Sequence, residues 1–114
     1  MKKEILDLAF KITKHIDNKL GEDTTILDIS EISSICDYFI ITSAQSARQV
    51  KAIADEIEDE LKKQEIFIFH KEGYDSGRWI LLDYGDIVVH IFHQEDREFY
   101  NIERIWKDAK AINL

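Results

Sequence analysis

Three aspartates in this sequence are candidates for a metal-dependent active site. Asp83 and Asp86 flank a short turn, and Asp37 begins an apolar run. Two or three carboxylates at strand ends can hold a divalent cation for phosphoryl or nucleotidyl transfer. That chemistry also needs a backbone cradle for phosphate, and the chain contains no G-x-x-x-x-G-K-[ST] loop or comparable glycine-rich turn. Because Asp beside Gly is ordinary turn chemistry, the residues favour a structural turn over a catalytic metal site.

His90, His93 and Cys36 are the side chains that suggest a transition-metal site. Residues three apart on a strand point to opposite faces, so the two histidines can share an ion only if the strand ends between them. Cys36 is the only cysteine, which excludes an internal disulfide and fits a reducing cytoplasm. We therefore expect neither metal nor cofactor, and we predict that His90 contacts Trp79 across two strands. Serine nucleophile motifs are also missing, so the sequence offers no complete catalytic set.

The stretch Arg78–Phe92 predicts the hairpin that positions several of these side chains. Two apolar runs flank Asp83-Tyr84-Gly85-Asp86, which is typical of a two-residue turn with Asp83 opposite Asp86. Alternation along both strands then separates the side chains into two faces. The aliphatic face predicts a core and contains Ile80, Leu82, Ile87, Val89 and Ile91. The mixed face contains Trp79, Leu81, Asp83, Asp86, Val88, His90 and Phe92.

The mixed face predicts a surface that binds another protein. Trp79 shares it with Asp83, and Tyr84 stands at the turn, where Asn or Gly would be easier. Two like charges facing each other across the turn are also unfavourable. Residues placed against local preference are better explained by a partner than by the fold. Aromatic anchors rimmed by carboxylates suit a surface rich in Arg or Lys, although a Trp can also fill the edge of a core.

The chain is acidic, with 23 Asp and Glu against 15 Lys and Arg and a formal net charge of −8. Proteins that bind mainly through phosphate need clustered Lys and Arg, so this balance argues against direct recognition of nucleic acid. A basic protein surface is the better partner, and such a contact would weaken as salt rises. The alternative is that the charge only keeps the protein soluble. No apolar stretch of about 18 residues exists, so we expect no membrane span.

Hydrophobic periodicity predicts one α/β domain over residues 1–114, since no proline, repeat or low-complexity linker marks a boundary. The expected helices cover residues 2–20, about 46–63 and about 99–109, and the expected strands cover 25–29, 37–42, 66–70, 79–82 and 87–92. A crossover through the second helix should be right-handed and should place the strands at 37–42 and 66–70 in parallel. The last three strands suit an antiparallel meander. The expected fold is a mixed sheet of about five strands with helices packed on it.

Motifs along nearly the whole chain resemble the ribosomal silencing factor family, also called RsfS or Iojap. Each motif alone is weakly specific, but their order and spacing together are specific. The segments are Asp37–Ser43, Arg48–Val50, Glu72-Gly73, Trp79–Phe92 and Arg97-x-x-Tyr100-x-Ile102-Glu103-x-x-Trp106. Tyr84 is a departure, because relatives often carry Leu at this position.

The resemblance implies a mixed α/β fold related to nucleotidyltransferases but without their catalytic motif, and a protein that is not an enzyme. It also implies a cytoplasmic homodimer that binds the large ribosomal subunit through ribosomal protein L-fourteen, blocks joining of the small subunit and represses translation when nutrients are limiting. The family's contact surface corresponds here to Trp79, Leu82, Asp83 and Tyr84. Other residues that match family motifs are assigned to structure: Asp37, Tyr38, Arg97 and Tyr100.

Two other functions stay open at this point. A metal-dependent nucleotidyltransferase would use Asp37, Asp83 and Asp86 and would bind nucleotide. A simple dimeric scaffold would use the face of Trp79 for self-association, and one face could serve a second copy and another partner in turn.

Overall fold

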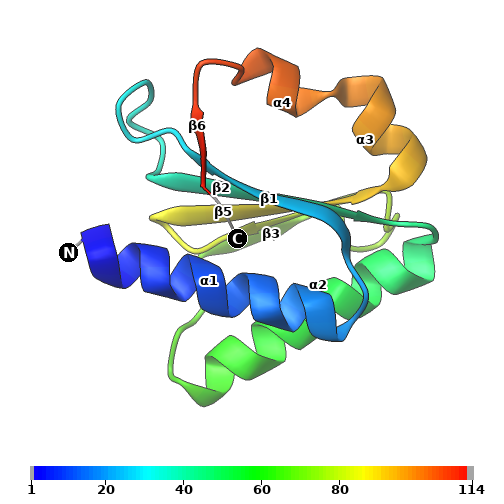
Figure 1. Ribbon diagram of the computed structural model, residues 1–114. Helices are drawn as coiled ribbons and strands as arrows, with labels where there is room; N and C mark the ends of the chain where they lie inside the picture. The colour runs from blue at the N-terminus through cyan, green and yellow to red at the C-terminus, as the bar shows by residue number, and fades with distance from the viewer. Residues whose placement is uncertain (1, 113–114) are drawn as a thin grey trace.

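The structure is a computed structural model that describes residues 2–112 (Figure 1). A central sheet has two long helices on one face and two short helices on the other. The helices are α1 (Lys2–Asn18), α2 (Ala47–Lys63), α3 (Gln94–Tyr100) and α4 (Ile102–Ile105). The strands are β1 (Glu22–Asp28), β2 (Tyr38–Ala44), β3 (His70–Glu72), β4 (Trp79–Asp83), β5 (Ile87–His93) and β6 (Lys110–Ile112). The expected mixed α/β fold is confirmed.

The strand order is β3-β4-β5-β2-β1-β6, with β2 and β5 at the centre. These two strands pair in parallel, and every other pair of neighbours among the described residues is antiparallel. All of β2 is buried, as is β5 except for its last residue, His93. Strands covered on both faces read as continuous apolar runs, which is why these two take the middle of the sheet.

The β4–β5 hairpin closes two positions away from its expected register. Asp83 lies opposite Val88 rather than Asp86, and the Tyr84 N–H donates to the Ile87 carbonyl at 2.9 Å. Gly85, with φ of +88°, therefore begins the two-residue turn, a position where glycine carries no steric cost. A shift of two residues leaves every side chain on its predicted face.

Three other sequence predictions were wrong. The strand expected at residues 66–70 lies instead at His70–Glu72. It runs parallel to β2, as expected, but β4 and β5 separate it from β2 in the sheet. The helix expected over residues 99–109 begins earlier, at Gln94, and breaks at Asn101, whose φ of 46° and ψ of 56° are left-handed. The residues after it form a sixth strand, β6, on the edge beside β1.

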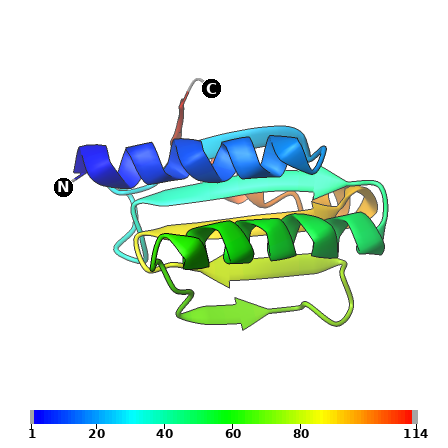
Figure 2. The same ribbon diagram turned by 90° about the horizontal axis from the view of Figure 1, so that it is seen from below.

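The two faces of the sheet carry separate hydrophobic clusters. Figure 2 shows α1 and α2 side by side over one face, where they cover the predicted aliphatic core. The mixed face is also largely covered: Val88, His90 and Phe92 are buried together with Phe39 and Ile102 of α4. The expectation that this whole face is a functional surface was wrong. Of its residues, only Trp79, Leu81 and Asp83 of β4 and the turn residue Asp86 reach solvent.

Candidate protein-binding face

Trp79 is the first residue of β4, and the backbone at Gly73, in the loop before it, packs closely against it. Gly73 has φ of +78°, and a side chain at this position would collide with the Trp79 carbonyl oxygen. The indole stacks on Phe92 with ring centroids 4.8 Å apart and contacts Tyr100 at 5.1 Å. Its Nε1 donates a hydrogen bond of 3.1 Å to His90 Nδ1, which confirms the predicted cross-strand contact. One side of Trp79 therefore packs against the hydrophobic cluster between the sheet and α3–α4, and the other side faces solvent.

His90 is held neutral beneath Trp79. Its side chain is 5% exposed, and burial lowers the pKa of the imidazole to about 4. Nδ1 accepts from Trp79, so Nε2 carries the proton, and this buried nitrogen has no hydrogen-bond partner among the described residues. Protonating the ring would place a charge in an apolar cluster and would remove the acceptor of Trp79.

We expect His90 to make the fold unstable in acid. The folded pKa is about 4 and the unfolded value about 6.5, so the unfolded chain binds more protons in this interval. Stability should thus fall as the pH drops from 6.5 to 4, by about 3 kcal/mol from this group. Urea unfolding of the wild type and His90→Gln at about pH 7.5 and 4.5 would measure the difference. Equal pH dependence in both proteins would contradict this role, since the carboxylates titrate in both.

Five residues around Trp79 form an aromatic surface with a carboxylate at its edge. We call it the Trp79 face; its members are Trp79, Leu81, Asp83, Phe99 and Tyr100. The β4 residues point to one side by alternation. Tyr100 is half-exposed against Trp79, and Phe99, 81% exposed, meets its ring edge-on at 5.0 Å. Large aromatics left in water in this way mark sites of association.

A shallow hollow of about 330 Å³ opens beside the indole. Leu81 and Trp79 form its apolar part, and Glu72 and Gly73 of the neighbouring strand end complete it. The Glu72 carboxylate also contacts His70 Nε2 at 2.7 Å. The hollow can take an apolar side chain, while Glu72 and Asp83 attract a nearby cation.

Asp83 has a structural role as well as a charge. Its Oδ1 accepts a 2.8 Å hydrogen bond from the Gly85 N–H and so holds the hairpin turn. The substitution Asp83→Asn keeps this acceptor and removes only the charge. It is therefore a cleaner probe of electrostatic attraction than Asp83→Lys, which would also break the turn.

Leu82 and Tyr84 were expected to contact a partner, but both lie on the opposite face beneath α1 and α2. Leu82 is fully buried, and Tyr84 is only 9% exposed within the same aliphatic cluster. Burial raises the pKa of the Tyr84 phenol and keeps it neutral. Tyr84 was placed at the tip of the turn because of the register error. Direct contact by these two side chains does not fit their burial.

Phe99 and Tyr100 were missed as members of this surface, and Leu81, although placed on the mixed face, was not among the predicted contact residues. Leu81 follows from Trp79 by simple alternation, so the signal for it was present in the sequence. Tyr100 matches a family motif but was assigned to structure. Its contact with Trp79 arises from the break at Asn101, which periodicity does not reveal.

The aspartates proposed as metal ligands do come to one end of the sheet. The Asp86 carbonyl accepts from the Asp37 N–H at 2.9 Å. Burial, with smaller contributions from the charges of Asp37 and Asp83, raises the pKa of the Cys36 thiol to about 11. Within residues 2–112, however, no group of three or more His, Cys, Asp or Glu side chains is arranged to hold a metal ion. Nothing in this arrangement favours the nucleotidyltransferase hypothesis.

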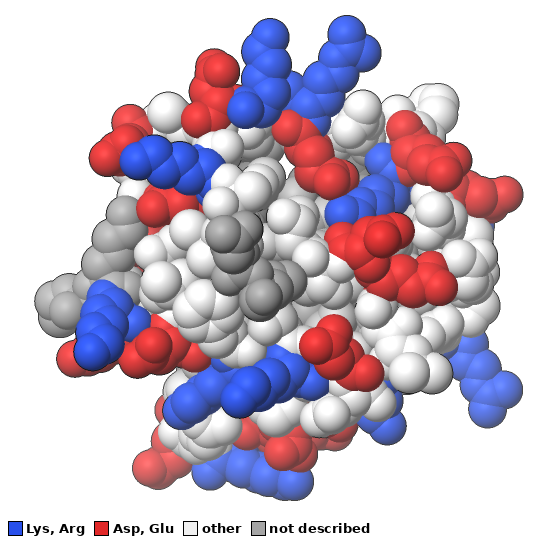
Figure 3. All heavy atoms as spheres, viewed as in Figure 1, with Lys and Arg blue, Asp and Glu red and all other residues white. Residues whose placement is uncertain are grey.

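Charges of both signs are interspersed on the face of the molecule seen in Figure 3, with uncharged side chains between them. No large basic field lies on this side, which agrees with the acidic net charge of −8. In the part of the chain that the structure describes, no helix combines the length and apolar character that crossing a membrane requires.

The fold and this face together define a class of small mixed α/β proteins whose exposed chemistry suits contact with another macromolecule. A family model described as "Ribosomal silencing factor during starvation" matches residues 2–114. The ribosomal silencing factor RsfS of Bacillus subtilis is 45% identical over 98 residues, covering 86% of this chain and 83% of that protein. The chain therefore belongs to the ribosomal silencing factor family, as its motifs indicated.

Two further comparisons agree over almost the full length. The RsfS protein of Halalkalibacterium halodurans is 41% identical over 111 residues, covering 97% of this chain and 92% of that protein. A crystal structure of a protein from Chromobacterium violaceum superposes with a TM-score of 0.88 at 34% identity, covering 90% of this chain and 86% of that one. The name that the two RsfS relatives carry is that of a regulatory factor.

Proposed function

We propose that this protein binds the large ribosomal subunit through ribosomal protein L-fourteen and there blocks joining of the small subunit. Translation is then repressed while nutrients are limiting. Family membership supports a ribosomal role. The observation that carries the site is the Trp79 face, where exposed aromatics and a hollow beside Trp79 lie next to carboxylates. Such a surface suits a basic protein better than RNA.

The mechanism is steric and electrostatic. A domain with a net charge of −8 is repelled by ribosomal RNA, so docking has to go through a protein patch that carries Lys or Arg. Occupancy of that patch excludes the small subunit without any bond being made or broken. The proposal therefore needs no catalytic residue and no cofactor, and it places the protein in the cytoplasm with the ribosomes. Without a subunit to bind, the free chain is expected to form a homodimer.

Subunit joining measured by light scattering tests this function. Large subunits preincubated with saturating protein should join small subunits to less than about one tenth of the normal extent, because the docked domain excludes the partner surface. Protein added to small subunits alone should not bind, and large-subunit RNA stripped of protein should bind it poorly. Undiminished joining at saturation would refute the proposal, as would binding to naked RNA as tight as binding to the intact subunit.

A further inference from the structure

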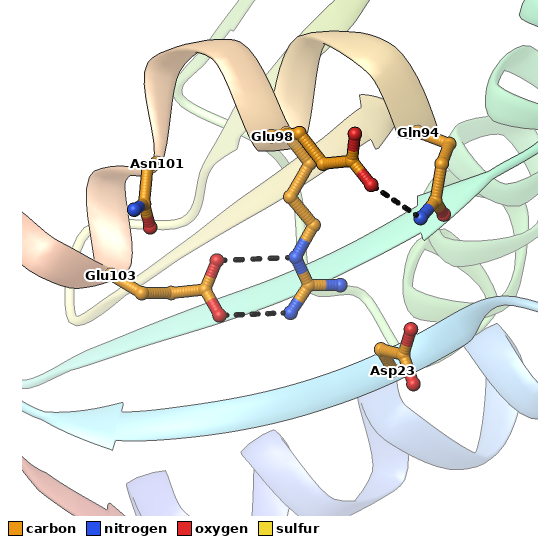
Figure 4. A pocket seen from close by; sticks show the side chains of 6 residues that line it. Asp23, Gln94, Glu98, Asn101 and Glu103 are labelled. Atoms are coloured by element: carbon orange, nitrogen blue, oxygen red, sulfur yellow. Dashed lines mark hydrogen bonds and ion pairs between the residues drawn. The ribbon is translucent and has the colours of Figure 1, made fainter.

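The side chain of Arg97 on α3 contacts the next helix, α4, and two strands that are distant in the sequence, β1 and β2. It extends from α3, is 12% exposed, and pairs with Glu103 of α4 through two hydrogen bonds of 3.1 Å, from Nε and Nη2. Its Nη1 donates to the Glu22 carbonyl of β1 at 3.2 Å and to Ser43 Oγ of β2 at 3.0 Å. Figure 4 shows the paired guanidinium and Glu103 in a hollow also lined by Asp23.

The α3–α4 segment itself has few buried residues. No residue of α3 is buried, and Ile102 is the only buried residue of α4. The two helices also meet at Asn101 in a left-handed conformation, so they do not form one continuous helix. With so small an apolar contribution, the position of this segment depends on polar contacts.

A second arginine contacts the other end of α3, but less firmly. Arg78, just before β4, donates to Asp96 Oδ1 at 2.6 Å and to Glu95 Oε1 at 3.2 Å. Its side chain is far more exposed than that of Arg97, and the Glu95 carboxylate lies in solvent. Water screens such pairs, so Arg78 constrains the segment less.

We infer that Arg97 is a positioning residue for the Trp79 face. By fixing α3 and α4 on the ends of β1 and β2, it holds Tyr100 against Trp79 and presents Phe99 beside them. Two of the five residues of the face depend on this segment. The inference rests on the proposed function for its consequence: a face assembled before contact binds more tightly than one that must order on binding.

Arg97→Lys is the substitution that isolates this role. A planar guanidinium forms two parallel bonds to one carboxylate and still donates to two further oxygens, whereas an ammonium group cannot satisfy this arrangement. The charge is kept, so long-range attraction or repulsion is unchanged. Arg104→Lys is the matched control, because Arg104 is an exposed arginine on α4.

Two measurements on the full chain test the inference. Hydrogen exchange without any partner should be about tenfold faster for amides 94–105 in Arg97→Lys, while the amides of β2 and β5 stay protected. Affinity for the large ribosomal subunit should fall about tenfold, and Arg104→Lys should match the wild type in both respects. Arg97→Lys should also retain wild-type far-ultraviolet circular dichroism.

The outcomes separate the inference from the proposed function. Unchanged hydrogen exchange over residues 94–105 in Arg97→Lys would overturn the inference about Arg97. Faster exchange combined with wild-type affinity would also overturn it. Faster exchange together with weaker binding supports it. If the wild type itself fails to bind the large subunit, the proposed function is refuted, and so is the predicted effect of Arg97→Lys on affinity. If exchange accelerates equally in β2 and β5, Arg97 stabilises the whole domain and is not a positioning residue.

Discussion

Replacing Trp79 with Ala is expected to weaken binding to the large ribosomal subunit by about a hundredfold. Trp79 is the central aromatic residue of the Trp79 face: it lines the hollow, and Tyr100 rests against it. Truncation removes the wall of the hollow and the support of Tyr100 together. Large aromatics at the centre of an interface give losses of this size because their whole contact area is withdrawn from water. Equilibrium sedimentation with purified subunits measures the change.

Two further variants control this experiment. Phe67→Ala removes another exposed aromatic, in the connection between α2 and β3, and should leave affinity unchanged. Trp79→Phe keeps a ring over Phe92 but loses the N–H that donates to His90, so it should weaken binding less than the alanine variant. Since Trp79→Ala also exposes Phe92, circular dichroism must first show that the protein is folded. Wild-type affinity in folded Trp79→Ala would remove this face from the proposed site.

Phe92→Ala is expected to lower the free energy of unfolding by about 3–5 kcal/mol. Phe92 lies on the central strand β5, is completely buried and stacks on Trp79, so its loss leaves a cavity between the sheet and α3–α4. Domains of this size have about 5–15 kcal/mol of total stability, so the variant should be close to unfolding at 37 °C. Urea denaturation monitored by circular dichroism gives the value.

The same substitution at Phe99 provides the comparison. Phe99 is exposed at the end of α3, and Phe99→Ala should change stability by less than about 0.5 kcal/mol. Its effect should instead be on binding, where it removes one aromatic of the Trp79 face. A similar loss of stability in both variants would show that α3 packs far more tightly than its exposure indicates.

Alternation in the hairpin explains why its faces could be predicted although its register could not. Ile80, Leu82 and Val89 share a face for any register that shifts by two residues, because the side-chain period of a strand is two. The register depended on whether Asp83 or Tyr84 is the last paired residue before the turn. The position of Gly85 indicates the observed register, because glycine suits the first position of a two-residue turn, where its φ is +88°.

Elements determined by tertiary contacts were less accessible from the sequence. Residues 66–69 are rich in residues that favour strands, yet they lie outside β3. Ile66 and Ile68 pack against the aliphatic core, while Phe67 and Phe69 are exposed. The pairing with β4 is made by His70–Glu72. The left-handed Asn101 divides a pattern that continues in the sequence, so the end of α3, all of α4 and the residues up to 109 read as one helix.

The candidate site was predicted only in part, because some of its residues follow from local strand alternation and others from tertiary contacts. Trp79 and Asp83 follow from the pattern of one strand and lie on the surface that the structure shows. Tyr84 was misplaced by the register. Phe99 and Tyr100 join the face only because Arg97 and Asn101 bring a distant segment over β4, and no local pattern carries that information.

The parallel pairing of β2 with β5 determines when this fold can form during synthesis. Tyr38 pairs with Ile87, about half the chain away, and α2, β3 and β4 all lie in the loop that this contact closes. Contacts so distant in sequence form slowly, and no hydrophobic cluster is complete without β5. A nascent chain that ends before β5 lacks one of the two central strands, and one that ends before α3 cannot present Phe99 or Tyr100. The Trp79 face can therefore be complete only after α3 and α4 have been synthesised.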